Sequence, residues 1–302
     1  MHSSLAHSPT PSAASPAPGP IDPATRMGTV RLRVADLARV TAFYETVLGL
    51  HRAGGESDRV RLSAGEHGPL IELVGDPSAR PRDPRSPGLF HLALLMPDRD
   101  ALAVALARLA THRWPLEGAS DHLVSEALYL SDPEGNGIEI YRDRPREEWP
   151  QQDGTLAMAT LPLDVQNLLG QVGDPSLIEK GAPAATRMGH VHLQVSDLQQ
   201  AEQFYCGVLG FEVTVRRYPG ALFVSAGGYH HHLGLNTWHS AGAPPRAAGG
   251  LGLQSFDVVL PTPQALEDVL TRVSRAGLDV EPRAEGGLVR DPFGNGVILR
   301  TA

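Results

Sequence analysis

The sequence predicts an α+β protein built from four βαβββ modules, two in each half of the chain. The segment RVADLARVTAFYETVLGLH (33–51) matches QVSDLQQAEQFYCGVLGFE (194–212) at a constant offset of 161 residues. A second pair, DPEGNGIEIYR (132–142) and DPFGNGVILRT (291–301), ends each half. Because both halves open and close with the same elements, the pattern indicates a duplicated structural unit.

The order of elements follows from changes in the period of the apolar residues. VRLRV (30–34) alternates apolar and polar residues as a half-buried strand does. Apolar residues then recur at helical spacing in LARVTAFYETVLG (37–49), where Asp36 is placed to cap the helix and Gly49 to end it. Short strands are predicted next, at 58–63 and 69–74 in the first half and at 221–226 and 231–237 in the second.

Each half then contains a second strand and helix. In the first half these are FHLALLM (90–96) and DALAVALARLATH (100–112), and in the second LQSFDVVL (253–260) and PQALEDVLTRVSRAG (263–277). Further strands surround the Asp-Pro-x-Gly-Asn turn, in which Pro and Gly supply the turn geometry. This order completes four βαβββ modules.

These elements divide the 302 residues into four parts. We expect a disordered tail at 1–26, a first domain at 27–150, a linker with room for one short helix at 151–186, and a second domain at 187–302. The tail is rich in Pro, Ser and Ala and lacks the apolar region of a signal peptide.

Composition restricts the class of protein and its partners. A formal net charge of -8 argues against nucleic acid and anionic membranes as partners. No apolar run approaches the ~18 residues that a membrane-spanning helix needs. The single cysteine, Cys206, excludes an intrachain disulfide and fits a reducing cytoplasm. We therefore expect a cytoplasmic protein in which Cys206, within a predicted helix, fills space rather than acting as a nucleophile.

Several motifs resemble the vicinal oxygen chelate superfamily, which includes glyoxalase I, fosfomycin-resistance proteins, bleomycin-binding proteins and extradiol dioxygenases. The segments that carry the resemblance are HVHLQVSDLQQAEQFYCGVLGF and DPEGNGIEIY, on paired βαβββ modules. GGYHHHLGLNTW together with DHLVSEALYLSDPEGNGIE is closer to bacterial catechol 2,3-dioxygenases. The resemblance extends from Met27 to the end and implies two vicinal oxygen chelate domains that form a pseudo-dimer within one chain. This scaffold supports several chemistries, so the reaction must be argued from the site.

In this superfamily a site is a cup made from two modules. Its ligands come from the first strand of one module and from the first and last strands of its partner. That pattern falls on Thr29, His91 and Glu139 in the first half and on His190, Ser255 and Ile298 in the second. Neither half alone offers two histidines and a carboxylate.

Some members of the superfamily exchange modules between halves, and such an exchange would supply a complete set of metal ligands here. Pairing the third module with the second would bring His91, Glu139 and His190 together. Two imidazoles and one carboxylate with open positions suit Fe(II) and O₂ chemistry. The other cup would hold Thr29, Ser255 and Ile298, which cannot bind a metal ion. Arg31 and Arg33 face that second cup and would further oppose a cation.

Other polar residues are expected near the functional cup. The resemblance implies that a histidine of YHHHLGL (229–235) acts near O₂, with His231 the first choice and His232 the rival, and that Tyr129 hydrogen-bonds a substrate hydroxyl. If this segment is a strand, His231 opposes His230 and His232 across it. His192 shares a face with His190 as a wall residue, and His122 is a candidate acid, base or substrate contact. The remaining histidines are expected to be bystanders: His2, His7, His51, His67, His112 and His239.

The resemblance implies an extradiol dioxygenase of aromatic compound degradation that cleaves a small aromatic diol with O₂. Fe(II) is the implied metal, with Mn(II), Zn(II) and Ni(II) as alternatives. A second interpretation is a glyoxalase-like isomerase or lyase, with a fourth ligand from His231 or His232. A third is a non-catalytic small-molecule binding or resistance protein. A homodimer is compatible with all three but is not required to form the site.

Overall fold

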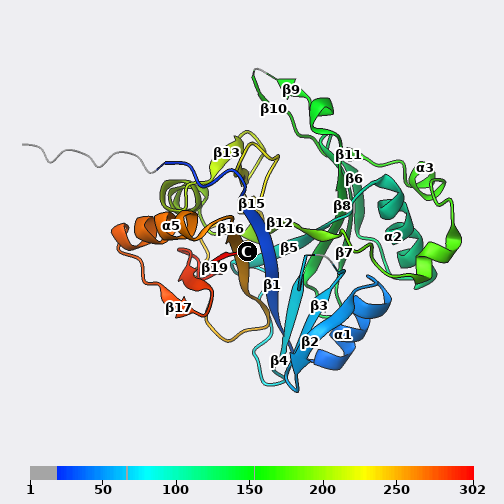
Figure 1. Cartoon of the computed structure of the whole chain (residues 1–302), viewed down its shortest axis with the longest axis horizontal. Coiled ribbons are helices and arrows are strands. Elements are labelled where there is room, and N and C mark those ends of the chain that lie inside the picture. Colours follow the sequence, from blue (N-terminus) through cyan, green and yellow to red (C-terminus); the bar gives the residue numbers. More distant parts are fainter. Residues whose placement is uncertain (1–18, 66, 153) are drawn as a thin grey trace, which may run out of the picture.

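Two large β-sheets form the body of the protein (Figure 1). The computed structural model describes residues 19–65, 67–152 and 154–302. The predicted tail lies outside the described residues up to residue 18, and so do His2 and His7. From residue 19 the chain follows the second half of the protein, where Ile21 is buried and its N–H donates to the Gly210 carbonyl.

The first half contains the two predicted βαβββ modules. The first module comprises β1 (Arg26–Val34), α1 (Leu37–Thr46), β2 (His51–Glu56), β3 (Arg59–Ser63) and β4 (Ile71–Gly75). The second comprises β5 (Gly88–Leu95), α2 (Arg99–Thr111), β6 (Gly118–Asp121), β7 (Ser125–Ser131) and β8 (Gly137–Asp143). The Asp36 carboxylate accepts the Arg39 N–H, and Gly49 has a φ of 72°, so the predicted cap and stop of α1 are confirmed.

The second half repeats the order. The third module comprises β12 (Arg187–Gln194), α4 (Leu198–Glu202), the π-helical turn η3 (Gln203–Val208), β13 (Glu212–Val215), β14 (Ala221–Ser225) and β15 (Leu233–Asn236). The fourth comprises β16 (Gly252–Leu260), α5 (Pro263–Arg275), β17 (Glu281–Arg283), β18 (Gly286–Arg290) and β19 (Gly296–Thr301). The predicted α+β class with four βαβββ modules is confirmed.

A short connecting region lies between the halves. It contains η1 (Arg146–Glu148), β9 (Gln151–Gln152), β10 (Thr155–Leu156), β11 (Leu161–Pro162), α3 (Val165–Leu169) and η2 (Pro175–Glu179). One short α-helix, α3, therefore lies within the predicted linker. Strand β11 pairs with β6 and so adds an edge strand to one of the two large sheets.

The modules pair across the halves. One sheet has the order β17-β18-β19-β16-β1-β4-β3-β2, which joins the fourth module to the first. The other has the order β11-β6-β7-β8-β5-β12-β15-β14-β13, which joins the second module to the third. In each sheet the two modules are joined by antiparallel pairing of their first strands, β1 with β16 and β5 with β12. The helices do not cross over: α1 and α2 lie on one side of the molecule and α4 and α5 on the other (Figure 1).

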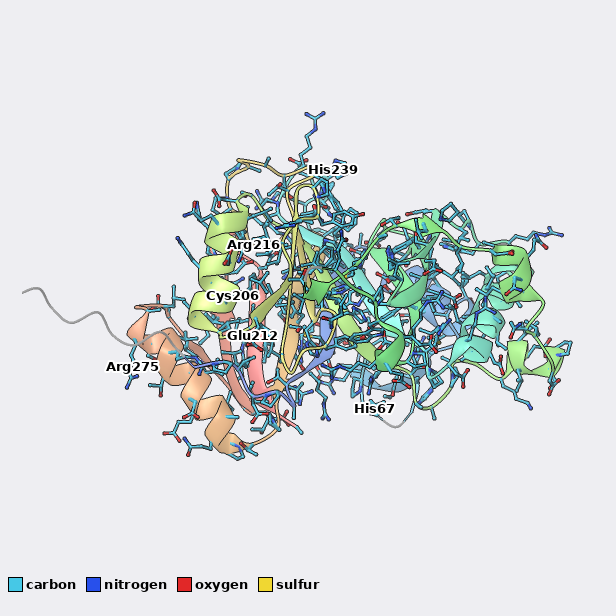
Figure 2. The ribbon with its side chains drawn as sticks, turned by 90° about the horizontal axis from the view of Figure 1, so that it is seen from above. His67, Cys206, Glu212, Arg216, His239 and Arg275 are labelled. Carbon is cyan, nitrogen blue, oxygen red and sulfur yellow. The ribbon has the colours of Figure 1, made fainter. Side chains whose placement is uncertain are left out.

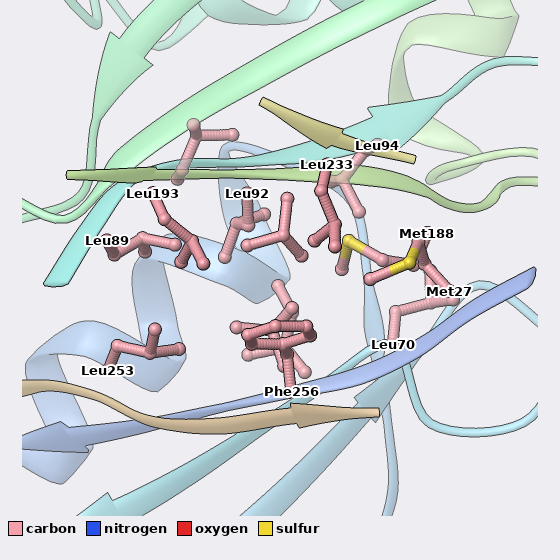
Figure 3. Close-up of a cluster of buried hydrophobic side chains, with 14 of the residues drawn as sticks. Met27, Leu70, Leu89, Leu92, Leu94, Met188, Leu193, Leu233, Leu253 and Phe256 are labelled. Carbon is pink, nitrogen blue, oxygen red and sulfur yellow. The ribbon is translucent and has the colours of Figure 1, made fainter. Parts of the chain in front are cut away.

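The main hydrophobic core lies between the two sheets (Figure 3). Leu92 and Leu94 of β5 and Leu193 of β12 extend from one sheet, and Leu253 and Phe256 of β16 face them from the other. All five are at most 4% exposed. Because side chains alternate along a strand, the opposite face of each sheet is left free to line a cup.

A repeated hydrogen bond explains why the two sequence repeats occur together. The Asp132 carboxylate in the first Asp-Pro turn accepts a bond from the Tyr44 hydroxyl of α1, at 3.4 Å. In the second half Asp291 accepts the equivalent bond from Tyr205, at 2.9 Å. In each half, the helix of the first repeat is therefore hydrogen-bonded to the Asp-Pro turn of the second repeat.

The free thiol of Cys206 lies in a helical segment of the third module. Figure 2 shows Cys206 on the helical segment that precedes β13, near Glu212 and Arg216. Burial, with the negative charge of Glu202, raises the pKa of the Cys206 thiol to about 12, so it is a poor nucleophile. Within the described residues, no helix combines the length and apolarity needed to cross a membrane.

Candidate metal centre

The three predicted metal ligands meet in one cup. Glu139 on β8 pairs with Ala93 on β5, and Ala93 pairs with His190 on β12, so the three positions form one row across the sheet. His91 lies two residues before Ala93 and therefore points to the same face. The crossed pairing of modules is what brings His190 from the second half next to Glu139 from the first.

The ligand atoms of the three side chains converge. They all lie within 4.8 Å of one another. Nε2 of His190 is 3.0 Å and Nε2 of His91 is 2.9 Å from the same Glu139 oxygen, Oε2. All three residues are at most 6% exposed.

The electrostatics favour an ionised Glu139 and a neutral His190, the forms in which these two side chains bind a metal. Burial would raise the pKa of the Glu139 carboxyl, but His190 and His91 hold it well below its usual value. Burial lowers the pKa of His190, against the opposing effect of Glu139. An ionised carboxylate beside a neutral imidazole is a ready ligand pair.

One unsatisfied atom shows that this donor set fits a metal. Although His91 Nε2 is close to Glu139, the geometry is unsuitable for a hydrogen bond, and this buried atom has no partner within the described residues. A buried polar atom without a partner costs about 1–3 kcal/mol. A cation facing the two imidazoles and the carboxylate would remove that cost, and this ligand set is typical of non-haem Fe(II) and related metals.

A cavity of about 780 Å³ opens on the triad. His91 and Glu139 line it, and His190 contacts Glu139 at 3.0 Å. The rings of Phe90, Phe223 and Trp238 are among the other lining groups. A pocket of this size, mostly apolar with a few convergent polar groups, is typical of a small-molecule site.

Tyr129 and His122 form a hydrogen-bonded pair in this cavity. His122 Nδ1 is 2.8 Å from the Ala159 carbonyl and Nε2 is 2.7 Å from the Tyr129 hydroxyl. Because a carbonyl only accepts, Nδ1 of the neutral ring carries the proton and Nε2 accepts from the tyrosine. Burial and the Glu139 charge raise the pKa of Tyr129 well above its usual value, so this hydroxyl stays protonated.

His231 lines the same cavity and is oriented by a chain of two further residues. His230 Nε2 is 2.8 Å from the Asp143 carboxylate, and His230 Nδ1 is 2.8 Å from His231 Nδ1. The ionised carboxylate accepts from His230, so His230 accepts from His231 in turn. That order leaves Nε2 of His231 with a free lone pair. Burial and the neighbouring His190 lower the pKa of His231 well below its usual value.

Of the other predicted site residues, some line the cavity and some do not. His192 lines the cavity, as expected. His232 is not among the residues that line the cavity, and its Nδ1 accepts the Ala226 N–H. The expected strand at 231–237 begins only at Leu233, so the three histidines occupy the preceding loop and do not simply alternate. His239, expected to be a bystander, lines the cavity, and Figure 2 shows it at the edge of the molecule.

Sequence reasoning missed Asp143 and the role of His230. Asp143 also accepts a hydrogen bond from the Tyr229 hydroxyl at 2.9 Å, and Tyr229 is 2.8 Å from the Tyr141 hydroxyl. A carboxylate four residues after Glu139, at the end of the same strand, was the available signal.

In the second cup the positions equivalent to the three proposed ligands carry Thr29, Ser255 and Ile298. Thr29 donates its hydroxyl to the Pro69 carbonyl at 2.7 Å, and Ser255 and Ile298 line a separate cavity. Arg31 and Arg33 line that cavity too. Within the described residues, the first cup holds the one cluster of histidine, cysteine and acidic side chains able to bind a metal.

Comparisons with known proteins agree with this architecture. The family model described as "Glyoxalase/Bleomycin resistance protein/Dioxygenase superfamily" matches residues 26–140 and 187–299. A curated protein of Bacillus subtilis (strain 168), catechol-2,3-dioxygenase, is 44% identical over 278 residues, which cover 91% of this chain and 96% of that protein.

Solved structures share the fold at low identity. A candidate dioxygenase from Bacillus subtilis subsp. subtilis str. 168 has a TM-score of 0.62 and 16% identity, covering 94% of this chain and 86% of that one. Glyoxalase I from Zea mays has a TM-score of 0.56 and 15% identity, covering 92% of each chain. At such identities these two structures bear on the fold alone.

Proposed function

The chain belongs to the glyoxalase/bleomycin resistance protein/dioxygenase superfamily, and we propose that it is a metal-dependent extradiol dioxygenase that cleaves a catechol-type substrate with O₂. The observation that carries this proposal is the His91–Glu139–His190 triad beside an aromatic-lined cavity. The 44% identical catechol-2,3-dioxygenase supports the same reaction class. We further propose Fe(II) as the metal and a role in aromatic compound degradation.

The metal would be held by His91, Glu139 and His190. When bound, it would supply Lewis acidity to the diol oxygens and a binding position for O₂. Both atoms of O₂ enter the ring-opened product, so the reaction needs no external reductant. Proton transfer, positioning of the substrate and exclusion of water would be carried out by the residues that line the cavity.

Tyr129 and His122 would remove a proton from the substrate. The Tyr129 hydroxyl donates to His122 Nε2, so its oxygen is free to accept a hydrogen bond from a substrate hydroxyl. A proton passed from the diol to Tyr129 would be matched by the tyrosine proton moving to His122. This pair would therefore ionise the diol without placing a separate charged base in the cavity.

His231 would serve as a second proton acceptor in the cavity, through Nε2. Asp143 and His230 direct its Nδ1–H away from the cavity, which leaves Nε2 as an acceptor. The rings of Phe90, Phe223 and Trp238 would position the aromatic substrate and exclude water. A cavity of about 780 Å³ has room for a diol with ring substituents.

A glyoxalase-like isomerase or lyase is the second candidate. It would use His231 as a fourth ligand, and one observation favours it: the His190 and His231 rings lie 4.1 Å apart. His231 is nevertheless not part of the cluster whose ligand atoms lie within 4.8 Å of one another. The three-ligand interpretation is therefore preferred.

One assay separates the two candidates. The purified protein is loaded with Fe(II) under anaerobic conditions, and catechol is then added in air. We expect a yellow ring-opened product that requires Fe(II) and is absent after loading with Zn(II). Isomerisation of a glutathione hemithioacetal with Zn(II) or Ni(II), without ring cleavage, would instead establish the second candidate.

The cellular setting is part of the proposal. A cytoplasmic enzyme is supported by its single cysteine, Cys206. All three proposed ligands belong to one chain, so a homodimer is compatible with the site but not needed to build it.

A further inference from the structure

We propose that the second cup, formed by the first and fourth modules, binds a small multivalent oxyanion with several carboxylate or phosphate groups. The cup contains a cavity of about 660 Å³, lined by eight arginines and two glutamates. None of the three proposed metal ligands lines it. This site is therefore separate from the proposed ring-cleavage site and goes beyond that function.

Arginines occupy positions that carry other side chains in the first cup. At the offset of 161 residues, Arg31 corresponds to His192, and Arg33 corresponds to Gln194. All four lie on the cup face of a first strand. The same scaffold thus presents imidazole and amide groups in one cup and guanidinium groups in the other.

Two buried carboxylates hold four of the arginines in place. Asp257 is fully buried and bonds Arg31 and Arg300. Glu72 is 4% exposed and lies 3.0 Å from both Arg59 and Arg61. Each carboxylate is shared between two guanidiniums, so each pair of arginines retains an excess positive charge.

Of the remaining arginines, Arg33 bonds Asp76, and Arg283 and Arg290 lie 3.0 Å and 4.0 Å from Glu281. Arg246 adds a further positive charge to the cup. Arg246 donates to the carbonyls of Leu251, at 2.7 Å, and Leu253 and makes no bond to a carboxylate within the described residues. Burial, together with repulsion from Arg82 and Arg33, lowers the pKa of Arg246 to about 10. The arginine remains charged at neutral pH, in surroundings dominated by other cations.

An anionic ligand would complete this arrangement. The Nε atom of Arg59 is buried and has no hydrogen-bond partner in the described part of the chain. Guanidinium groups form paired hydrogen bonds to carboxylates and phosphates. The chain as a whole has a net charge of -8, so the positive cup is a local feature and would concentrate anions there.

Isothermal titration calorimetry of the iron-loaded, full-length protein tests the proposal. The probes are tricarballylate, which carries carboxylates alone, and phosphoenolpyruvate, which also carries a phosphate. Acetate at matched ionic strength controls for general screening. We expect saturable binding of one probe molecule per chain by at least one of the two, and the stronger probe identifies the preferred group. No saturable heat with either probe would overturn the proposal.

Variants locate the binding. Arg61→Gln and Arg290→Gln each remove one lining guanidinium, and the Arg290 side chain is 50% exposed, so the second change is tolerable for folding. Each should weaken binding by about tenfold or more, as expected for a lost charged hydrogen bond. Arg216→Gln removes the same charge from an exposed pair with Glu202. Arg216, labelled in Figure 2, does not line the cup, so this change should leave affinity unchanged. Equal weakening in all three variants, with unchanged iron content, would show a general charge effect and refute the assignment.

Discussion

Replacing His190 with alanine tests the crossed pairing of modules, because this residue alone brings a ligand from the second half to the metal site. Loss of a partner that merely orients a ligand typically lowers metal affinity by about 10–100-fold. Loss of a direct ligand should cost more. After anaerobic Fe(II) loading and gel filtration, His190→Ala should retain roughly a tenth or less of the wild-type iron.

The same substitution should have only a modest effect on the free energy of unfolding of the metal-free protein. His190 Nε2 bonds an ionised carboxylate at 3.0 Å, and such a bond contributes about 1.5–3 kcal/mol to the free energy of unfolding. His91 remains 2.9 Å from the same Glu139 oxygen, so the carboxylate keeps a polar neighbour and the lower end of that range applies. Urea unfolding of the chelated protein should therefore show a loss of about 1.5–2 kcal/mol.

Thr29→Ala is the matched control, because Thr29 has the equivalent position in the second cup. It loses one neutral hydrogen bond, to Pro69 at 2.7 Å, worth about 0.5–1.5 kcal/mol. Its iron content and ring-cleavage rate should equal those of the wild type. Full iron retention in His190→Ala, or two equivalents of iron per wild-type chain, would refute the assignment of the triad.

Three further predictions concern the proton-handling residues and the two halves. Tyr129→Phe should keep its iron but lower the initial rate of product absorbance by about 10²–10⁴-fold, because the proton path to His122 is broken; a wild-type rate would exclude that path. His231→Ala should also keep one iron per chain and turn over slowly, whereas loss of the metal would favour the four-ligand isomerase. Chains 1–150 and 187–302, expressed separately, should each lose metal affinity, since neither holds all three ligands. Iron-dependent catechol cleavage by 187–302 alone would contradict the pairing.

The fold could be predicted from the repeats and the periods of the apolar residues. The metal cluster could be predicted from the ligand positions that the superfamily resemblance implies. The repeats at 33–51 and 194–212 have a clear strand-to-helix period, and the cap at Asp36 matches the structure. The ligand positions and the exchange of modules were implied by the superfamily resemblance, and at those positions only one pairing collects two imidazoles and a carboxylate.

Other parts of the site depend on contacts that sequence spacing does not encode. The loop before β15 rotates His230 and His231 so that their Nδ1 atoms meet at 2.8 Å, which strict strand alternation would forbid. Asp143 was missed because its importance comes only from its contact with His230. The second cup was recognised from Arg31 and Arg33, but its further arginines come from distant segments that meet only in the folded sheet.

The crossed sheets also constrain how the protein can be made. Strand β5 ends at Leu95, and its partner β12 begins only at Arg187. The separation is longer for β1, which ends at Val34, because its partner β16 begins only at Gly252. During synthesis the first half therefore emerges from the ribosome with one edge of β1 and one edge of β5 unpaired, and such edges promote association between chains. A ribosome that stalls between the halves would release an aggregation-prone fragment, so chaperone demand should peak before the second half appears.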